Sequence, residues 1–276
     1  MTVQETEGAG GYVLGHSDRE LERLERQATF FGDMTREVLV RAGIEPGMRV
    51  LDLGCGVGDV SMIAADLVGA DGEVVGIDIS PDALAVATRR AQASGRAIAE
   101  FVHSRIDDYQ GIDGFDAIVG RFIMVHLPKS GETLGRLVRE ARPNAIFAFA
   151  EMDLDTVSAS GETPLLDQCV AWVAEVYRRA GLDPNPGAGL FATFKAAGLH
   201  PQMFGMTRIG DSQDMPGFAF LAESVRSMLP MIEKLGIASP QDIGIDTLRE
   251  RLLAEAAQAD TCVFYPRFVG GWGRVQ

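Results

Sequence analysis

Residues 49–60, RVLDLGCGVGDV, contain the most informative pattern in the chain. The apolar residues Val50, Leu51 and Leu53 predict a short buried strand, which three glycines and then a helical pattern follow. Glycine permits positive φ angles and, because it has no Cβ atom, lets a ligand approach the backbone closely. Open α/β sheets bind their ligands at the carboxyl ends of their strands. The stretch therefore predicts a ligand-binding turn directly after a buried strand.

The spacing of the glycines indicates which kind of ligand this turn accepts. Gly54, Gly56 and Gly58 form a G-x-G-x-G pattern, whereas the fingerprint of dinucleotide-binding proteins is G-x-G-x-x-G. Asp59 stands where that third glycine would be. A carboxylate there would repel a pyrophosphate but tolerates a cationic cofactor without phosphate. The pattern therefore disfavours an NAD-dependent dehydrogenase.

The segment LDLGCGVG at residues 51–58 resembles the first motif of class I S-adenosylmethionine-dependent methyltransferases. Residues 73–80 (EVVGIDIS), 115–127 (FDAIVGRFIMVHL) and 143–153 (PNAIFAFAEMD) resemble later parts of the same fold. The resemblance extends over roughly residues 12–210 and is strongest to small-molecule members, of the kind found in ubiquinone and natural-product biosynthesis. It implies a Rossmann-like α/β fold, with a doubly wound, seven-stranded, mostly parallel sheet, and S-adenosyl-L-methionine as the cofactor. It leaves the substrate open.

The composition restricts the partners that we expect. The net charge of −14 disfavours nucleic acid, because phosphate binding requires clustered Lys and Arg side chains. The three cysteines are widely spaced and form neither a disulfide framework nor a metal motif. The apolar runs are too short to span a bilayer and no signal peptide is evident, so we expect a cytoplasmic protein that does not bind membranes. A homo-oligomer remains possible.

The order of the elements predicts a core with a helical insertion. Residues 1–11 are expected to be a loose tail, and residues 12–216 with 260–276 a cofactor-binding core that begins with a helix over Glu20–Ala42. Strand and helix patterns alternate from residue 49 to residue 152, which predicts the parallel sheet. Residues 217–259 are expected to form a helical insertion before a closing strand over Thr261–Val269, with GGWGRV after it. This insertion and the N-terminal helix would form a lid, or else extend the edge of the sheet.

The resemblance also implies which residues bind the cofactor. Asp78 lies 20 residues after Gly58 and would bind the two ribose hydroxyl groups. Arg105 and Ile106 would lie at the adenine, although family members often have an acidic residue where Arg105 stands. Tyr12 and Gln27 would fold over the bound cofactor. The remaining positions are Asp52, Gly54, Gly56, Gly58 and Arg121 at the methionine part and Ile79 at the adenine.

His126 and Glu151 are the candidate catalytic residues. A histidine has a pKa of about 6.5 and suits proton transfer at neutral pH, although His126 could instead only order its loop. Glu151 and Asp153 could bind a substrate amine or accept a proton, or could each pair with an arginine. No metal-ligand spacing is present.

These residues predict methyl transfer to an oxygen or carbon atom, less readily a nitrogen, of a small and largely apolar metabolite of specialised metabolism. Methionine and phenylalanine side chains are abundant between residues 203 and 231 and suggest an adaptable apolar pocket. The alternative is a cyclase or a regulatory module that binds the cofactor without transferring a methyl group.

Overall fold

The computed structural model describes residues 18–96, 98–127 and 129–276, with side chains from residue 30 onward. A seven-stranded sheet forms its centre, in the order β3-β2-β1-β4-β5-β10-β7. Strand β10 is antiparallel to both β5 and β7, and the other paired strands run parallel. The predicted fold class is therefore confirmed. The strands are β1 (Arg49–Leu53), β2 (Glu73–Asp78), β3 (Ala99–His103), β4 (Ala117–Arg121), β5 (Ile146–Asp153), β7 (Gln202–Met206) and β10 (Arg267–Arg274).

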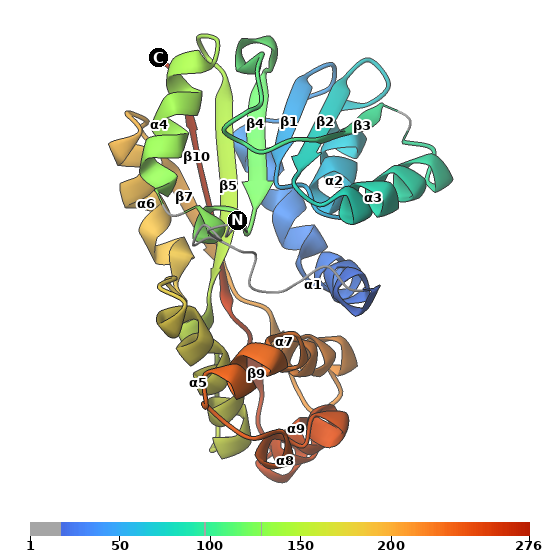
Figure 1. The fold of residues 1–276 in the computed structure, drawn as a ribbon, viewed down its shortest axis with the longest axis vertical. Coiled ribbons are helices and arrows are strands. Elements are labelled where there is room, and N and C mark those ends of the chain that lie inside the picture. Colours follow the sequence, from blue (N-terminus) through green and yellow to red (C-terminus); the bar gives the residue numbers. More distant parts are fainter. Residues whose placement is uncertain (1–17, 97, 128) are drawn as a thin grey trace, which may run out of the picture.

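Helices cover both faces of the sheet (Figure 1). Successive strand residues point to opposite faces, so Val50 joins one apolar core and Leu51 joins the other. Helices α1 (Asp18–Ala42) and α2 (Asp59–Val68) pack on the first face. Helices α4 (Ser130–Glu140) and α6 (Pro186–Ala196) pack on the second, and α3 (Pro81–Ala93) packs against β2 and β3. Because both faces are covered, the strands read as nearly continuous apolar runs.

The strand order reverses between β1 and β4. Leu51 of β1 pairs with Val75 of β2 on one side and with Ile118 of β4 on the other, so these parallel strands end at the same edge of the sheet. Residues that follow their carboxyl ends therefore converge there. Such a switch point is where open α/β sheets form their ligand crevice.

A second group of elements lies beyond the carboxyl ends of the strands (Figure 1). Helix α7 contacts α1, α5 and α9, and a small sheet in the order β6-β9-β8 lies beside them. Helices α7, α8 and α9 separate β7 from β10, where the sequence predicted helices. The members of this group are α5 (Pro164–Arg179), α7 (Met215–Lys234), α8 (Pro240–Ile243), α9 (Leu248–Gln258), β6 (Ser158–Ala159), β8 (Ile209–Gly210) and β9 (Val263–Phe264).

The prediction of the closing strand was wrong in its bounds. The segment 261–269 is divided between β9 and the start of β10, and the glycine-rich segment expected after the strand continues β10 to Arg274. These glycines have a packing reason, since a Cβ atom on Gly270 would lie 2.3 Å from Cγ2 of Val38. Glycine in a strand permits this close approach of α1 to the sheet.

Candidate functional site

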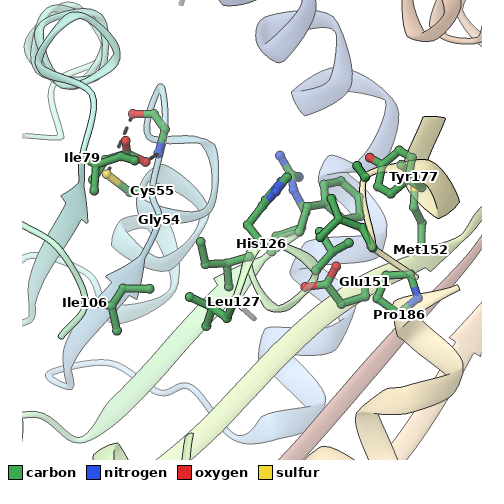
Figure 2. Close-up of a pocket in the computed structure, with 18 of the residues that line it drawn as sticks. Gly54, Cys55, Ile79, Ile106, His126, Leu127, Glu151, Met152, Tyr177 and Pro186 are labelled. Atoms are coloured by element: carbon green, nitrogen blue, oxygen red, sulfur yellow. Dashed lines mark hydrogen bonds between the residues drawn. The ribbon is translucent and has the colours of Figure 1, made fainter. Parts of the chain in front are cut away.

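A cavity of about 1200 Å³ lies at the carboxyl ends of β1, β2, β4 and β5 and extends to helices α5 and α7. Pockets for one small ligand usually measure roughly 300–1,000 Å³. The cavity is thus large enough to hold two small molecules side by side. Figure 2 shows Gly54, Cys55 and Ile79 at one end and Glu151, Met152 and Tyr177 at the other.

The glycine turn forms one wall of this cavity. Gly54, Gly56 and Gly58 have φ angles of 64°, 53° and 84°, which side chains other than glycine rarely adopt. Gly54 and Gly56 line the cavity, and nothing lies within 4 Å of the place where a Cβ atom of Gly56 would be. Gly58 instead packs against the core, because its Cβ atom would come within 2.9 Å of the Phe101 ring. Two of the three predicted glycines therefore face the cavity.

Asp78 is held at the end of β2 by two backbone groups. Its Oδ2 accepts a hydrogen bond of 2.9 Å from Gly56 N–H, and its Oδ1 accepts one of 2.8 Å from Ser80 N–H. Each oxygen of an ionised carboxylate can accept a further hydrogen bond. Ile79, which is 50% exposed, and Ile106 line the same part of the cavity. The structure thus brings together the residues predicted to bind ribose and adenine.

Arg105 lines the cavity with a largely exposed side chain. That side chain is 71% exposed, and its Nε lies 4.0 Å from Oδ2 of Asp108. An exposed pair of this length contributes little energy. Its predicted contact with adenine stays a prediction.

Asp52 lies behind the turn and not among the residues that line the cavity. It is almost fully buried and its Oδ2 accepts a hydrogen bond of 2.6 Å from the Ser61 hydroxyl. Its Oδ1 has no hydrogen-bond partner within the described part of the chain. Burial raises the pKa of Asp52 from 3.8 to about 7. The residue can act on a cofactor through its charge, and not through direct contact in this arrangement.

Arg121 links the cavity to α1. Its side chain, 6% exposed, donates hydrogen bonds of 3.0 Å to Thr35 Oγ1 and 3.1 Å to Asp59 Oδ2. Asp59 also accepts a hydrogen bond of 2.7 Å from Arg90. Both Asp59 and Arg121 line the cavity. The sequence identified Asp59 only as an obstacle to pyrophosphate, and nothing in it indicated that this residue joins three elements.

Phe122 follows Arg121 in an unusual backbone conformation, with a φ angle of 57°. A bulky residue at positive φ is strained, and such strain is commonly found at functional sites. The ring packs edge-on against Phe31 of α1, with centroids 5.0 Å apart, and Phe122 also lines the cavity. No pattern in the sequence predicted this conformation.

The carboxyl group of Glu151 is buried in the cavity wall. Its Oε1 accepts a hydrogen bond of 2.7 Å from Met124 N–H, while Oε2 has no hydrogen-bond partner among the described residues. Burial raises the pKa of Glu151 from 4.5 to about 8. His126 lies in the short 3₁₀ helix Met124–His126 and lines the same region (Figure 2). The structure therefore brings together both predicted catalytic residues.

The pairing with arginine applies to Asp153 and not to Glu151. Asp153 is fully buried, accepts hydrogen bonds of 3.0 Å and 2.5 Å from Arg267, and accepts one from Ala188 N–H. Its carboxylate has a structural role. No arginine pairs with Glu151 in the part of the chain that the structure describes.

Two predicted cofactor residues lie outside this description. Tyr12 is not among the described residues, and Gln27 lies in α1 at a position whose side chain is not described. Their roles stay predictions.

Helices α5 and α7 form the far end of the cavity, with mostly apolar side chains. The sequence predicted α5 as a helix but did not assign it to the pocket. Of the methionines and phenylalanines expected there, Phe220 and Met228 line the cavity, whereas Met203, Phe204 and Met206 do not. The lining residues of the two helices are Cys169, Val170, Val173, Tyr177, Phe220, Leu221, Ser224, Val225, Ser227 and Met228.

The described residues lack both a membrane-spanning helix and a metal-binding cluster. No helix there combines the length and the apolar character needed to cross a membrane. No group of three or more His, Cys, Asp or Glu side chains there is arranged to hold a metal ion.

Comparison with known families identifies the central part of this chain. A family model described as a methyltransferase domain matches residues 44–178. Residues 44–178 form a methyltransferase domain. The match includes β1 to β5, the glycine turn and most of α5, and it confirms the resemblance of residues 51–58 to the class I methyltransferases.

The names of curated relatives of the methyltransferase domain indicate different substrates. An arsenite methyltransferase of Aquipseudomonas alcaligenes is 32% identical over 125 residues, which are 42% of this chain and 36% of the relative. A 2-phytyl-1,4-naphtoquinone methyltransferase of Synechococcus elongatus is 36% identical over 110 residues, which are 39% of this chain and 47% of the relative. The chain thus spans about half the length, or less, of these curated relatives.

Solved structures resemble more of the chain than the methyltransferase domain alone. The YcgJ protein of Bacillus subtilis has a TM-score of 0.58 at 16% identity and covers 88% of this chain and 99% of its own. A SAM-dependent methyltransferase of Aquifex aeolicus has a TM-score of 0.54 at 16% identity, with 95% and 100% coverage. The [4+2]-cyclase SpnF has a TM-score of 0.51 at 18% identity, with 87% and 80% coverage. At these identities the likeness concerns the fold.

Proposed function

We propose that this protein transfers a methyl group from S-adenosylmethionine to an oxygen or carbon atom, less readily a nitrogen, of a small and largely apolar metabolite of specialised metabolism. One observation carries the proposal. A single cavity joins the glycine turn and Asp78 to an apolar chamber between α5 and α7. The quinone-related names of two relatives, demethylmenaquinone methyltransferase and 2-phytyl-1,4-naphtoquinone methyltransferase, agree with an apolar acceptor.

The residues at the sheet end of the cavity fit an adenosine cofactor. Asp78 can accept hydrogen bonds from the ribose hydroxyl groups, and the half-exposed Ile79 offers an apolar surface to the adenine, with Ile106 opposite. The open space at Gly56 admits the methionine part. Asp59 is paired with Arg90 and Arg121, so the carboxylate of Asp78, which has no ion pair among the described residues, provides the negative potential that a cation prefers. When bound, S-adenosylmethionine supplies an electrophilic methyl group.

The chain itself has three tasks in this reaction. The chamber between α5 and α7 excludes water and orients the acceptor toward the glycine turn. His126 is positioned to take a proton from an oxygen acceptor. Glu151 is the second titratable group that faces the acceptor, deeper in the wall.

Calorimetry with S-adenosylhomocysteine tests the cofactor assignment. We expect binding in the micromolar range, about −8 kcal/mol, and no measurable binding of NAD. The absence of measurable S-adenosylhomocysteine binding, or tight NAD binding, would contradict the proposal. Mass spectrometry of acceptor mixtures then separates methyl transfer from the cyclase or regulatory alternative, in which the cofactor binds but no acceptor gains a methyl group.

A further inference from the structure

Glu151 is the one acidic side chain in the cavity wall that is nearly fully buried and has an oxygen without a partner in the described part of the chain. Asp59 and Asp78, which also line the cavity, have both oxygens engaged. A buried polar atom without a partner costs free energy that a ligand group can recover. Oε2 of Glu151 is therefore a candidate contact for the acceptor.

The surroundings of Glu151 determine what its carboxyl group can offer. The amide groups of residues 123–125 surround the carboxyl group, and the N–H of Met124 donates to Oε1 at 2.7 Å. Because Oε1 already accepts, a proton on the carboxyl group belongs on Oε2. Burial raises the pKa of Glu151 to about 8 although these amides lower it, which favours the protonated form at neutral pH. The group then donates a hydrogen bond rather than accepting a proton.

The chamber next to Glu151 is mostly apolar. Met152 and Leu154 continue from the same strand, and Val173, Leu221 and Val225 face them from α5 and α7. Figure 2 places Glu151 between His126 and Met152, on the side of the cavity away from Ile79. A molecule bound in this chamber meets the Glu151 carboxyl group within a mostly apolar wall, in which Tyr177, Ser224 and Ser227 carry the hydroxyl groups of the facing helices.

We propose that Glu151 binds the acceptor by donating a hydrogen bond from Oε2–H to a carbonyl or enolate oxygen, while the apolar body of the acceptor lies between α5 and α7. The inference rests on the proposed function and specifies its substrate class. A donor in a water-excluded site stabilises negative charge on such an oxygen. This would favour methyl transfer to a carbon atom next to the carbonyl group over transfer to oxygen. His126 would take the proton that this carbon loses, the electron pair of the enolate would form the bond to the methyl group, and the electrons of the S–CH₃ bond would remain on the sulfur of S-adenosylhomocysteine.

Two probes of the same shape test the contact. 1-Tetralone and tetralin are bicyclic molecules that differ by one carbonyl oxygen, and their affinities can be measured by calorimetry with S-adenosylhomocysteine at saturation. We expect the parent protein to bind 1-tetralone about three- to tenfold more tightly than tetralin, the ratio for one hydrogen bond. Glu151→Gln should keep this ratio, since its amide can accept from Met124 N–H and donate into the chamber. Glu151→Leu should lose it.

Each outcome decides for or against the contact. Equal affinity of the parent for the two probes, or binding of neither, overturns the proposal, as does loss of the ratio in Glu151→Gln. If Glu151→Leu fails to fold, the affinities of 1-tetralone and tetralin can still be compared in the parent and in Glu151→Gln. S-adenosylhomocysteine binding is measured first in every protein, so a failure of the proposed function shows as its absence and is distinct from a failure of this contact.

Discussion

At the scale of single residues, two buried carboxyl groups set this site apart from the rest of the described chain. Asp52 and Glu151 lie on β1 and β5, and each keeps one oxygen without a hydrogen-bond partner. Burial raises the pKa of both. Groups shifted in this way cluster at functional sites, because a protein rarely retains their cost elsewhere. Asp52 lies behind the glycine turn and Glu151 lies in the cavity wall, so both positions agree with that rule.

The raised pKa of Glu151 predicts how stability depends on pH. The folded protein holds a proton that the unfolded chain releases near pH 4.5, so the free energy of unfolding falls as the pH rises from there through about 8. Each pKa unit corresponds to about 1.4 kcal/mol. Glu151→Gln cannot ionise and should lose less stability than the parent between about pH 5 and pH 9. Urea unfolding at both pH values measures this; equal losses would contradict the burial argument.

Asp78 is the residue whose replacement should most directly affect the cofactor. Asp78→Ala removes both the predicted ribose contact and the hydrogen bond that holds Gly56 N–H. We expect S-adenosylhomocysteine binding to weaken by about 1.5–3 kcal/mol, the range for a hydrogen bond to a charged group. Asp82→Ala, an exposed carboxylate in the first turn of α3, is the matched control and should leave calorimetric affinity unchanged. Similar effects of both variants would point to a general electrostatic cause.

At the scale of elements, the sequence predicts individual helices and strands well, but it predicts poorly which of them pack against one another. The strands over 49–53 and 73–78 agree with the structure at both ends, because an apolar run between turn residues defines a buried strand. Glycine at positive φ and an acid at the end of β2 could likewise be predicted. The periodicity of a helix shows its apolar face but not the element against which that face packs. The place of α5 in the cavity wall could therefore not be predicted from the sequence. Nor could the contact of Arg121 with Thr35, which are 86 residues apart.

That contact predicts that α1 and the cofactor turn are coupled. Thr35→Val would leave the buried Arg121 without one of its acceptors, at a cost of about 1–3 kcal/mol in stability. Because Arg121 also pairs with Asp59 beside the turn, we expect S-adenosylhomocysteine affinity to fall as well. Thr35→Ser keeps the hydroxyl group and should behave like the parent. If Thr35→Val lost stability but bound S-adenosylhomocysteine like the parent, α1 would be a packing element only.

Because α5 lines the far end of the cavity, a substitution in α5 should weaken binding of the acceptor without changing binding of the cofactor. Val173 is buried and lines the far end of the cavity, so Val173→Phe should fill the space of the acceptor. We expect 1-tetralone binding to fall at least tenfold, about 1.4 kcal/mol, while calorimetry shows unchanged affinity for S-adenosylhomocysteine. Ala171→Phe adds a ring to the exposed face of the same helix and is the control. Equal loss of both ligands in Val173→Phe would indicate one undivided site.

At the scale of the whole molecule, the cavity lies between the sheet and the helices beyond it, and we expect a ligand to enter between these two parts. The start of α7 is firmly held, since a Cβ atom on Gly217 would lie 2.0 Å from the Tyr265 hydroxyl and Phe220 stacks on Phe30 at 4.7 Å. The start of α7 therefore packs closely against Tyr265 and α1. We expect the movement that admits the acceptor to involve α5 and the later part of α7.

Hydrogen exchange can follow this movement. S-adenosylhomocysteine alone should slow exchange in the glycine turn, residues 54–58. Adding 1-tetralone should further protect α5 and the part of α7 after Phe220, since their amides open when the chamber opens. Helix α6 packs on the face of the sheet away from α1, and Pro186 is its one residue that lines the cavity. Hydrogen exchange in α6 should therefore stay constant. Exchange in α5 and α7 that is equal in every state would contradict this opening, because local opening of the wall that admits a ligand exposes the amides of that wall to solvent.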